Sequence, residues 1–256
     1  MAGLGVLLRK ELLESWRTLR LPIVGGLFVF VGLSSPMLAK FLPEIVKAAG
    51  GDQFPTIDIP TPVIADAIGQ LWKNLAQFGA FAAIILAMGA VSGELDRGTA
   101  AFVLSKTATR GAFLAGKVAS IAAVLGVSTL LAVLLGWIYT AILFEPPPIA
   151  GWVAFAALAW LGLFAWAAIT LAGSAVTGST AAAAGLGFVA WLVLSIVSAI
   201  PGLARFVPGG LAEPAIALAA GVPVDADDVL VPVAATLAIV VLALAVTTRS
   251  FRRREL

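Results

Sequence analysis

The residues of this chain whose types and spacing could do chemistry are concentrated in one polar segment, residues 93–117. The segment carries six charged side chains, four basic and two acidic, between apolar runs long enough to cross a bilayer. A polar segment between two membrane helices must face water, and local signals predict that it is folded: Thr99 can cap a short apolar helix at residues 100–104, and Thr109 can open the next helix. We therefore expect this segment to contact a partner.

The residue types that the chain lacks exclude most catalytic and metal chemistry. There is no cysteine and no histidine, so the chain cannot build thiol nucleophiles, disulfides, zinc or haem sites, or Ser-His catalytic pairs. Residues 111–117 match the GxxxxGK pattern of a phosphate-binding loop, but Val118 stands where that loop needs Ser or Thr, and no strand precedes the pattern. The sequence therefore predicts no enzyme activity, no cofactor and no metal in this chain.

The elements that must position the segment are membrane helices. Of the 256 residues, 61% are hydrophobic, against about 45–50% in soluble domains, and the mean hydropathy is +1.07. Residues 1–20 carry basic side chains among leucines and show no cleavage site, so we expect the apolar run that follows to be retained as an anchor. The sequence predicts an all-α integral membrane protein with a single domain, residues 1–256.

Six apolar segments approach or exceed the roughly 20 residues that a spanning helix needs. They are residues 21–42, 71–91, 118–144, 149–173, 181–200 and 230–248. Another apolar stretch, within residues 201–229, is interrupted by Arg, Glu, Gly and Pro. Such a stretch cannot cross as one helix, so it predicts short, broken helices that re-enter the outer interface between spans five and six.

The N-terminal residues predict an amphipathic helix that lies flat in the headgroup layer. Leu4, Leu8, Leu12 and Trp16 recur at helical spacing, and charged residues such as Arg9 lie off that stripe. The basic side chains would contact anionic lipid, as would the arginine cluster near the C-terminus. This helix is either a plain retention anchor or an elbow that braces the first span and borders the partner.

The distribution of basic residues predicts which side of the membrane each loop faces. Twelve of the 16 Lys and Arg residues lie in the N-terminus, residues 93–117, the turn at residues 174–180 and the C-terminus. Loops rich in Lys and Arg stay on the cytoplasmic side. We therefore expect a multi-pass protein of the cell membrane with both termini and residues 93–117 in the cytoplasm. Because the bases are sorted by side, the chain's pI does not indicate a nucleic-acid partner.

The remaining features leave alternatives open. Residues 43–70 predict a polar outer loop whose carboxylates are either merely solvated or bind a cation or an outer partner, and residues 63–75 predict an amphipathic helix. Spans four and five are rich in small residues, which indicates tight packing within the chain or across an oligomer. The predicted spans hold no clear mid-membrane Asp, Glu, Lys or Arg, which ion-coupled transporters usually place there. Energy for uphill movement would have to come from outside the chain.

The run GELDRGTAAFVLSKTATRGAFLAGK at residues 93–117 resembles the cytoplasmic signature of ABC type-2 permeases. In that family a Gly-Glu pair, a charged residue and Arg-Gly-Thr precede a short apolar helix, a turn and a helix that carries Lys. Residues 9–12, Arg-Lys-Glu-Leu, resemble the family's opening, and the order of spans is similar over nearly the whole chain. The chain departs from relatives at Thr107, where they often have Pro. Within the family it is most similar to the copper-site maturation group that serves nitrous-oxide reductase assembly.

The resemblance implies the permease subunit of an ATP-driven exporter. Two permease chains, identical or different, would each bind one ATP-binding subunit through a coupling helix at residues 100–104, and ATP and Mg would be held by that subunit. The coupling residues it implies are Glu94, Asp96, Arg97, Gly98, Thr99, Phe102, Leu104, Arg110 and Lys117. The elbow residues it implies are Arg9, Lys10, Glu11 and Trp16.

A second function is compatible with the same residues. The chain could be a non-transporting membrane scaffold or assembly factor that holds an extracytoplasmic partner through residues 43–70 and 202–229. Nucleotide-dependent movement with a bound ATPase would favour the exporter, and its absence the scaffold. An intramembrane enzyme is disfavoured because no nucleophile and base are visible as a pair.

Overall fold

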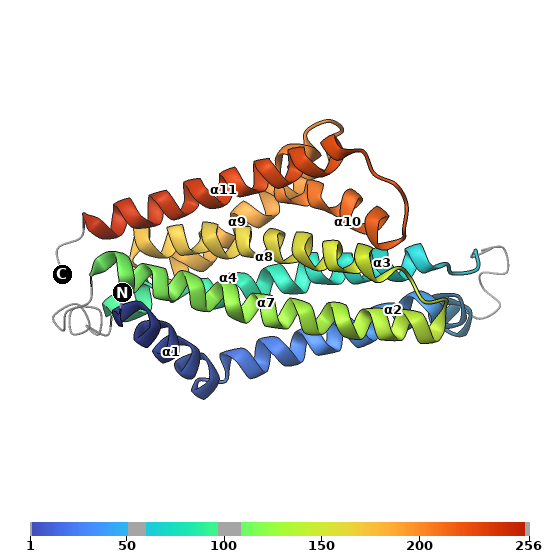
Figure 1. The fold of residues 1–256 in the computed structure, drawn as a ribbon, viewed down its shortest axis with the longest axis horizontal. Helices are drawn as coiled ribbons and strands as arrows, with labels where there is room; N and C mark the ends of the chain where they lie inside the picture. The colour runs from blue at the N-terminus through green and yellow to red at the C-terminus, as the bar shows by residue number, and fades with distance from the viewer. Residues whose placement is uncertain (1, 51–59, 97–108, 254–256) are drawn as a thin grey trace.

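Helices make up all the regular secondary structure in the residues that the structure, a computed structural model, describes: 2–50, 60–96 and 109–253. Six helical stretches are long and apolar enough to cross a membrane, which confirms the six predicted spans. They are α2 (Arg20–Gly50), the stretch formed by α3 (Ile64–Asn74), the π-helical turn η2 (Leu75–Gly79) and α4 (Ala80–Met88), then α7 (Arg110–Leu143), α8 (Ile149–Thr177), α9 (Thr180–Ser198) and α11 (Ala226–Arg252). The start of the chain and the end of α11 lie at the same end of the bundle, which we call the termini end; the other is the far end (Figure 1).

A separate N-terminal helix, α1 (Ala2–Arg17), meets α2 at a sharp angle (Figure 1). The break lies at Thr18 and Leu19, where Leu19 takes the left-handed conformation with φ 60°. This confirms a distinct elbow helix, but α1 packs chiefly against α7, not against the first span as expected. Ser15 faces the bundle, whereas the Trp16 side chain is 61% exposed and can reach the lipid boundary.

The bundle is organised around α8, which contacts α4, α7, α9 and α11, while α2 packs along α7. Large apolar side chains such as Phe28 and Phe155 are completely buried between these helices. Small residues let some helices approach closely: a Cβ atom added at Gly32 of α2 would lie 2.5 Å from the carbonyl oxygen of Ala132 in α7. The two helices therefore touch through their backbones at this point.

The structure corrects both ends of the predicted loop at residues 43–70, whose middle, residues 51–59, lies outside the described residues. Helix α2 continues through Pro43 to Gly50, and α3 runs without a break through η2 into α4. Proline is tolerated in membrane helices because neighbouring groups satisfy the backbone that it frees. Polar side chains of α3 also find partners inside the bundle: Asn74 Nδ2 donates to Ser35 Oγ at 2.8 Å. The predicted helix at residues 63–75 is thus the part of the second span nearest the far end.

The far end carries the predicted broken segment. Between α9 and α11 lie η3 (Ala204–Phe206), η4 (Pro208–Leu211) and the short helix α10 (Ala212–Ala219), which packs on α8 and α3. Gly202 and Gly221 have φ values of 82° and 75°, a conformation that glycine adopts without steric cost. The chain can therefore turn sharply on both sides of these short helices.

Candidate functional site

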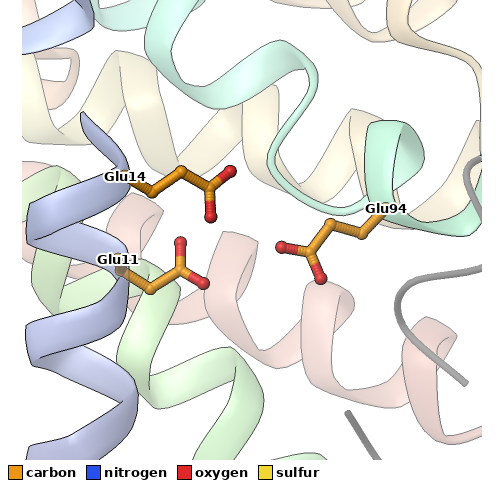
Figure 2. Close-up of side chains that lie close together, drawn as sticks. All are labelled: Glu11, Glu14 and Glu94. Carbon is orange, nitrogen blue, oxygen red and sulfur yellow. The ribbon is translucent and has the colours of Figure 1, made fainter. Parts of the chain in front are cut away.

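Five charged side chains from three elements meet at the termini end and form what we call the ionic cluster. Lys117 Nζ of α7 lies 2.5 Å from Glu94 Oε1 and 3.2 Å from Glu11 Oε2. Lys10 Nζ of α1 lies 3.2 Å from Glu11, 3.4 Å from Glu14 and 3.5 Å from Glu94. Glu94 belongs to α5 (Ser92–Asp96), the short helix that follows the second span. Figure 2 shows the carboxylates of α1 and of Glu94 turned toward one another.

The centre of the ionic cluster is buried. Lys117 is 4% exposed and Glu94 is 6% exposed, and the ring of Phe113 covers the Lys117 ammonium at 5.1 Å. A buried charge is tolerated only when it is paired, because it has lost its hydration. Lys117 is therefore held in place by its two carboxylate partners, and these in turn fix α1 and α5 against α7.

Lys10 forms the outer part of the cluster, and its pKa reports its surroundings. Partial burial alone would lower the pKa of Lys10. The carboxylates of Glu11, Glu94 and Glu14 outweigh burial, so the pKa is raised above the ordinary value of a lysine. The contribution of Lys10 to stability is therefore complete at neutral pH and is lost only as the pH rises through this raised value.

The three carboxylates of the cluster have the spacing of a possible cation site. Oxygen atoms of Glu11, Glu14 and Glu94 lie within 4.8 Å of one another. Two ammonium groups of the chain itself contact these carboxylates, and they balance most of their charge. The cluster is thus an internal ion-pair network that joins three helices.

A network of hydrogen bonds fixes the start of the segment that follows the second span. Ser174 Oγ of α8 accepts from the backbone N–H of Ser92 at 3.0 Å and lies 3.1 Å from Ser92 Oγ. Ser92 Oγ also lies 2.9 Å from Thr180 Oγ1, at the start of α9. Ser92 and Ser174 are completely buried. The turn from the second span into α5 is therefore fixed to the α8–α9 corner.

The end of the same segment is fixed by the first turn of α7. Arg110 Nη1 donates to the carbonyl oxygen of Arg252 at 2.8 Å, and the rings of Phe113 and Phe251 stack at 5.4 Å. Both contacts join α7 to the last turn of α11. The cation of Arg110 also suits the C-terminal end of that helix, where the helix dipole is negative.

Thr109 caps α7 as predicted: its side chain accepts from the backbone N–H of Ala112 at 3.1 Å. Replacing Thr109 by alanine is expected to lower the free energy of unfolding by about 1 kcal/mol, because one N–H at the helix start loses its partner. Thr109→Ser keeps the acceptor and should change little. Thermal unfolding of both variants measures the difference, and equal values would contradict the cap.

The predicted site residues divide into two groups. The structure brings Lys10, Glu11, Glu94 and Lys117 together, and it places Arg110 beside α11. Arg9 and Trp16 are exposed on α1 and lie outside the cluster, and Asp96 ends α5. The other predicted coupling residues, together with the predicted coupling helix at residues 100–104, lie outside the described residues: Arg97, Gly98, Thr99, Phe102 and Leu104.

Sequence reasoning missed Glu14, Ser92, Ser174 and Thr180 as parts of this site. Glu14 carries a local signal, because it follows Lys10 by one helical turn and pairs with it. The serines and Thr180 carry none, since they meet only when the second span packs against α8 and α9. Their contacts are a product of the tertiary fold.

Comparison with known proteins places the chain in a family. Residues 6–216 match the family described as ABC-2 family transporter protein. An uncharacterized transmembrane protein of Bacillus subtilis (strain 168), YxlG, is 30% identical over 220 residues, which cover 82% of this chain and 82% of that protein. The family match includes every residue of the ionic cluster and the elements on both sides of residues 97–108. The chain therefore belongs to the ABC-2 family of membrane transport proteins.

Proposed function

We propose that this chain is the permease subunit of an ATP-driven exporter. It works as a dimer of permease chains in the cell membrane, with the termini end in the cytoplasm, and each chain binds a separate subunit that hydrolyses ATP. The positive charge of the termini-end loops supports this orientation. Family membership supports the transport role.

The observation that carries the proposal is the buried pair of Glu94 and Lys117. Glu94 precedes residues 97–108 and Lys117 follows them, so the contact between the two side chains joins the two ends of the segment that would receive the ATPase. We call this junction the base of the segment. Glu11 joins the elbow helix to the same base. A force applied to the segment would then act on the second span, α7 and α1 together, instead of being absorbed by a loose loop.

Burial also indicates that the predicted coupling residues have two different roles. Glu94 and Lys117 are too buried to offer much surface to a partner, so their role is to hold the base. Contact with the ATPase belongs to the segment itself, including Arg97, Phe102 and Leu104. This division refines the interpretation of the sequence, in which all these residues shared one docking role.

The test is purification of the chain with its ATP-binding partner, followed by measurement of ATP turnover with and without the permease. Arg97→Glu is expected to weaken ATPase binding by about tenfold or more, as reversal of an interface charge does. Arg205→Glu makes the same charge change at the far end and should leave binding unchanged. If no ATP-binding protein copurifies with the wild type, or if the complex shows no nucleotide-dependent change, the exporter proposal is wrong and the scaffold function is favoured.

A further inference from the structure

A cavity opens in the half of the bundle toward the far end. It has a volume of about 560 Å³ and lies between the α3–η2 stretch, α8, α9 and the η4–α10 segment. This volume is within the range of sites that take small organic molecules, roughly 300–1,000 Å³. One wall is the π-helical turn η2, an irregularity that is frequent at functional sites.

An exposed lysine, Lys73, lines this cavity from within a helical stretch that is long and apolar enough to span a membrane. Lys73 follows Ile64 by about 14 Å along the helix axis, at 1.5 Å per residue, in a helical stretch that continues to Met88. No ion pair or hydrogen bond holds the Lys73 ammonium among the residues that the structure describes. Charged residues are rare inside spans and generally serve a ligand or an ion when they occur there.

The other polar groups of the cavity are rich in hydrogen-bond donors. Trp72, Trp166 and Trp191 line it, and their indole N–H groups donate to no other described residue. By contrast, Trp137 and Trp160 elsewhere in the bundle each donate to a backbone carbonyl, at 3.1 and 3.0 Å. An indole can only donate, and so can an ammonium group. The lining therefore carries three indoles and one ammonium group whose donors have no partner among the described residues.

The rest of the lining determines what kind of molecule fits. Among the described residues, no Asp or Glu lines the cavity, and small or aliphatic residues of α8, α9 and the η4–α10 segment make up most of the remaining wall. Open donors and one cation favour a group with negative charge and several acceptors, and the apolar wall favours a hydrocarbon chain. Lys73, Ala76 and Gln77 of the lining are all exposed, so the cavity opens on the flank of the bundle, where a molecule can enter from the membrane.

We propose that this cavity binds an amphiphile with an anionic head group, with Lys73 as the residue that selects the charge. The head group lies against Lys73 and the indole N–H groups, and the apolar chain lies along α8 and α9. As a transport site, this cavity rests on the proposed function, and it adds a substrate class to it: the exported molecule would be an acidic amphiphile. The binding itself needs neither ATP nor a partner.

The test is direct binding of dansyl-undecanoic acid to the purified chain in phosphatidylcholine nanodiscs, read as energy transfer from tryptophan to dansyl. The wild type is expected to bind the ionised acid more tightly than its uncharged methyl ester. Lys73→Gln should weaken binding of the acid by about tenfold, the usual effect of losing a charge-assisted hydrogen bond, and should leave the ester unchanged. Lys73→Arg should retain the preference for the acid.

Two further variants separate the site from general effects. Lys47→Gln removes an exposed lysine of α2 that does not line the cavity, and it should bind as the wild type does. Ala76→Trp fills the cavity from its exposed side, so it should abolish binding of both acid and ester without disturbing the core. Equal binding of the acid by the wild type and Lys73→Gln, or undiminished binding by Ala76→Trp, would overturn the proposal.

A second copy of the chain is the rival occupant. Because the chain has no cysteine, Ser195→Cys introduces a single thiol at the cavity. Cross-linking of this thiol between two copies, together with no probe binding, would show that the cavity is sealed by the partner and would overturn the proposal. If the probe binds but the chain does not couple to an ATPase, only the exporter proposal is refuted. If the chain couples to an ATPase but does not bind the probe, only the proposed anionic site is refuted.

Discussion

Replacing Lys117 by methionine is expected to lower the free energy of unfolding by about 3–5 kcal/mol, the typical cost of removing one partner of a buried ion pair. The variant keeps the length of the side chain but leaves Glu94 and Glu11 without the ammonium that they share. Unfolding by denaturant in detergent micelles measures the change. The same variant should reduce ATPase coupling, since the base of the segment is no longer held.

A double-variant cycle gives this prediction its control. Glu94→Gln added to Lys117→Met removes the buried negative charge as well, so the double variant should be more stable than the sum of the single effects requires. Lys47→Met removes an exposed lysine and should cost little. If Lys117→Met is no more destabilising than Lys47→Met, the ionic cluster does not hold the base together.

Gly32→Ala is the second change with a large expected effect. The new methyl group would lie 2.5 Å from the carbonyl oxygen of Ala132, so α2 and α7 must separate where their backbones touch. Overpacking of this kind costs about 1–3 kcal/mol, and Gly32→Leu should cost more. Thermal unfolding in bicelles measures both variants.

Gly26 provides a matched control on the same helix. A Cβ atom there meets nothing within 4 Å, so Gly26→Ala should be neutral or slightly stabilising, because alanine favours the helix more than glycine does. Equal stability of Gly26→Ala and Gly32→Ala would mean that α2 and α7 do not approach as closely as described.

Local patterns were sufficient to predict the architecture. Hydropathy located the six spans, the spacing of leucines and Trp16 predicted the helix before them, and Thr109 marked the start of α7. Each of these signals lies within a few residues of the feature that it predicts. The broken helices around Gly202 and Gly221 were also visible, because Gly and Pro interrupt an apolar run.

The ionic cluster could be predicted only in part. Glu94 and Lys117 were singled out as coupling residues, but their contacts with α1 join residues 84 and 106 positions apart. Pairing over such distances depends on how the helices pack, which no local pattern records. The docking role of residues 93–117 and the similarity to the nitrous-oxide reductase maturation group stay predictions.

The second span shows how polar side chains fit within a helix of the bundle. Lys73, Asn74 and Gln77 lie near the start of the predicted span at residues 71–91, and the helix runs through all three. Asn74 is satisfied by Ser35 of α2, and Lys73 and Gln77 face a cavity. Polar residues within a span are stable where the protein supplies a partner or an opening, and both depend on the tertiary structure.

The stacked rings of Phe113 and Phe251 tie together two spans that are far apart in sequence. With the guanidinium of Arg110 bound to the end of α11, the two helices share one joint at the termini end. Helix α7 is 34 residues long, about 50 Å at 1.5 Å per residue. A tilt of both helices about that joint would move their opposite ends, Leu143 of α7 and Ala226 of α11, together, so a movement imposed at the termini end would be carried to the far end by two spans at once.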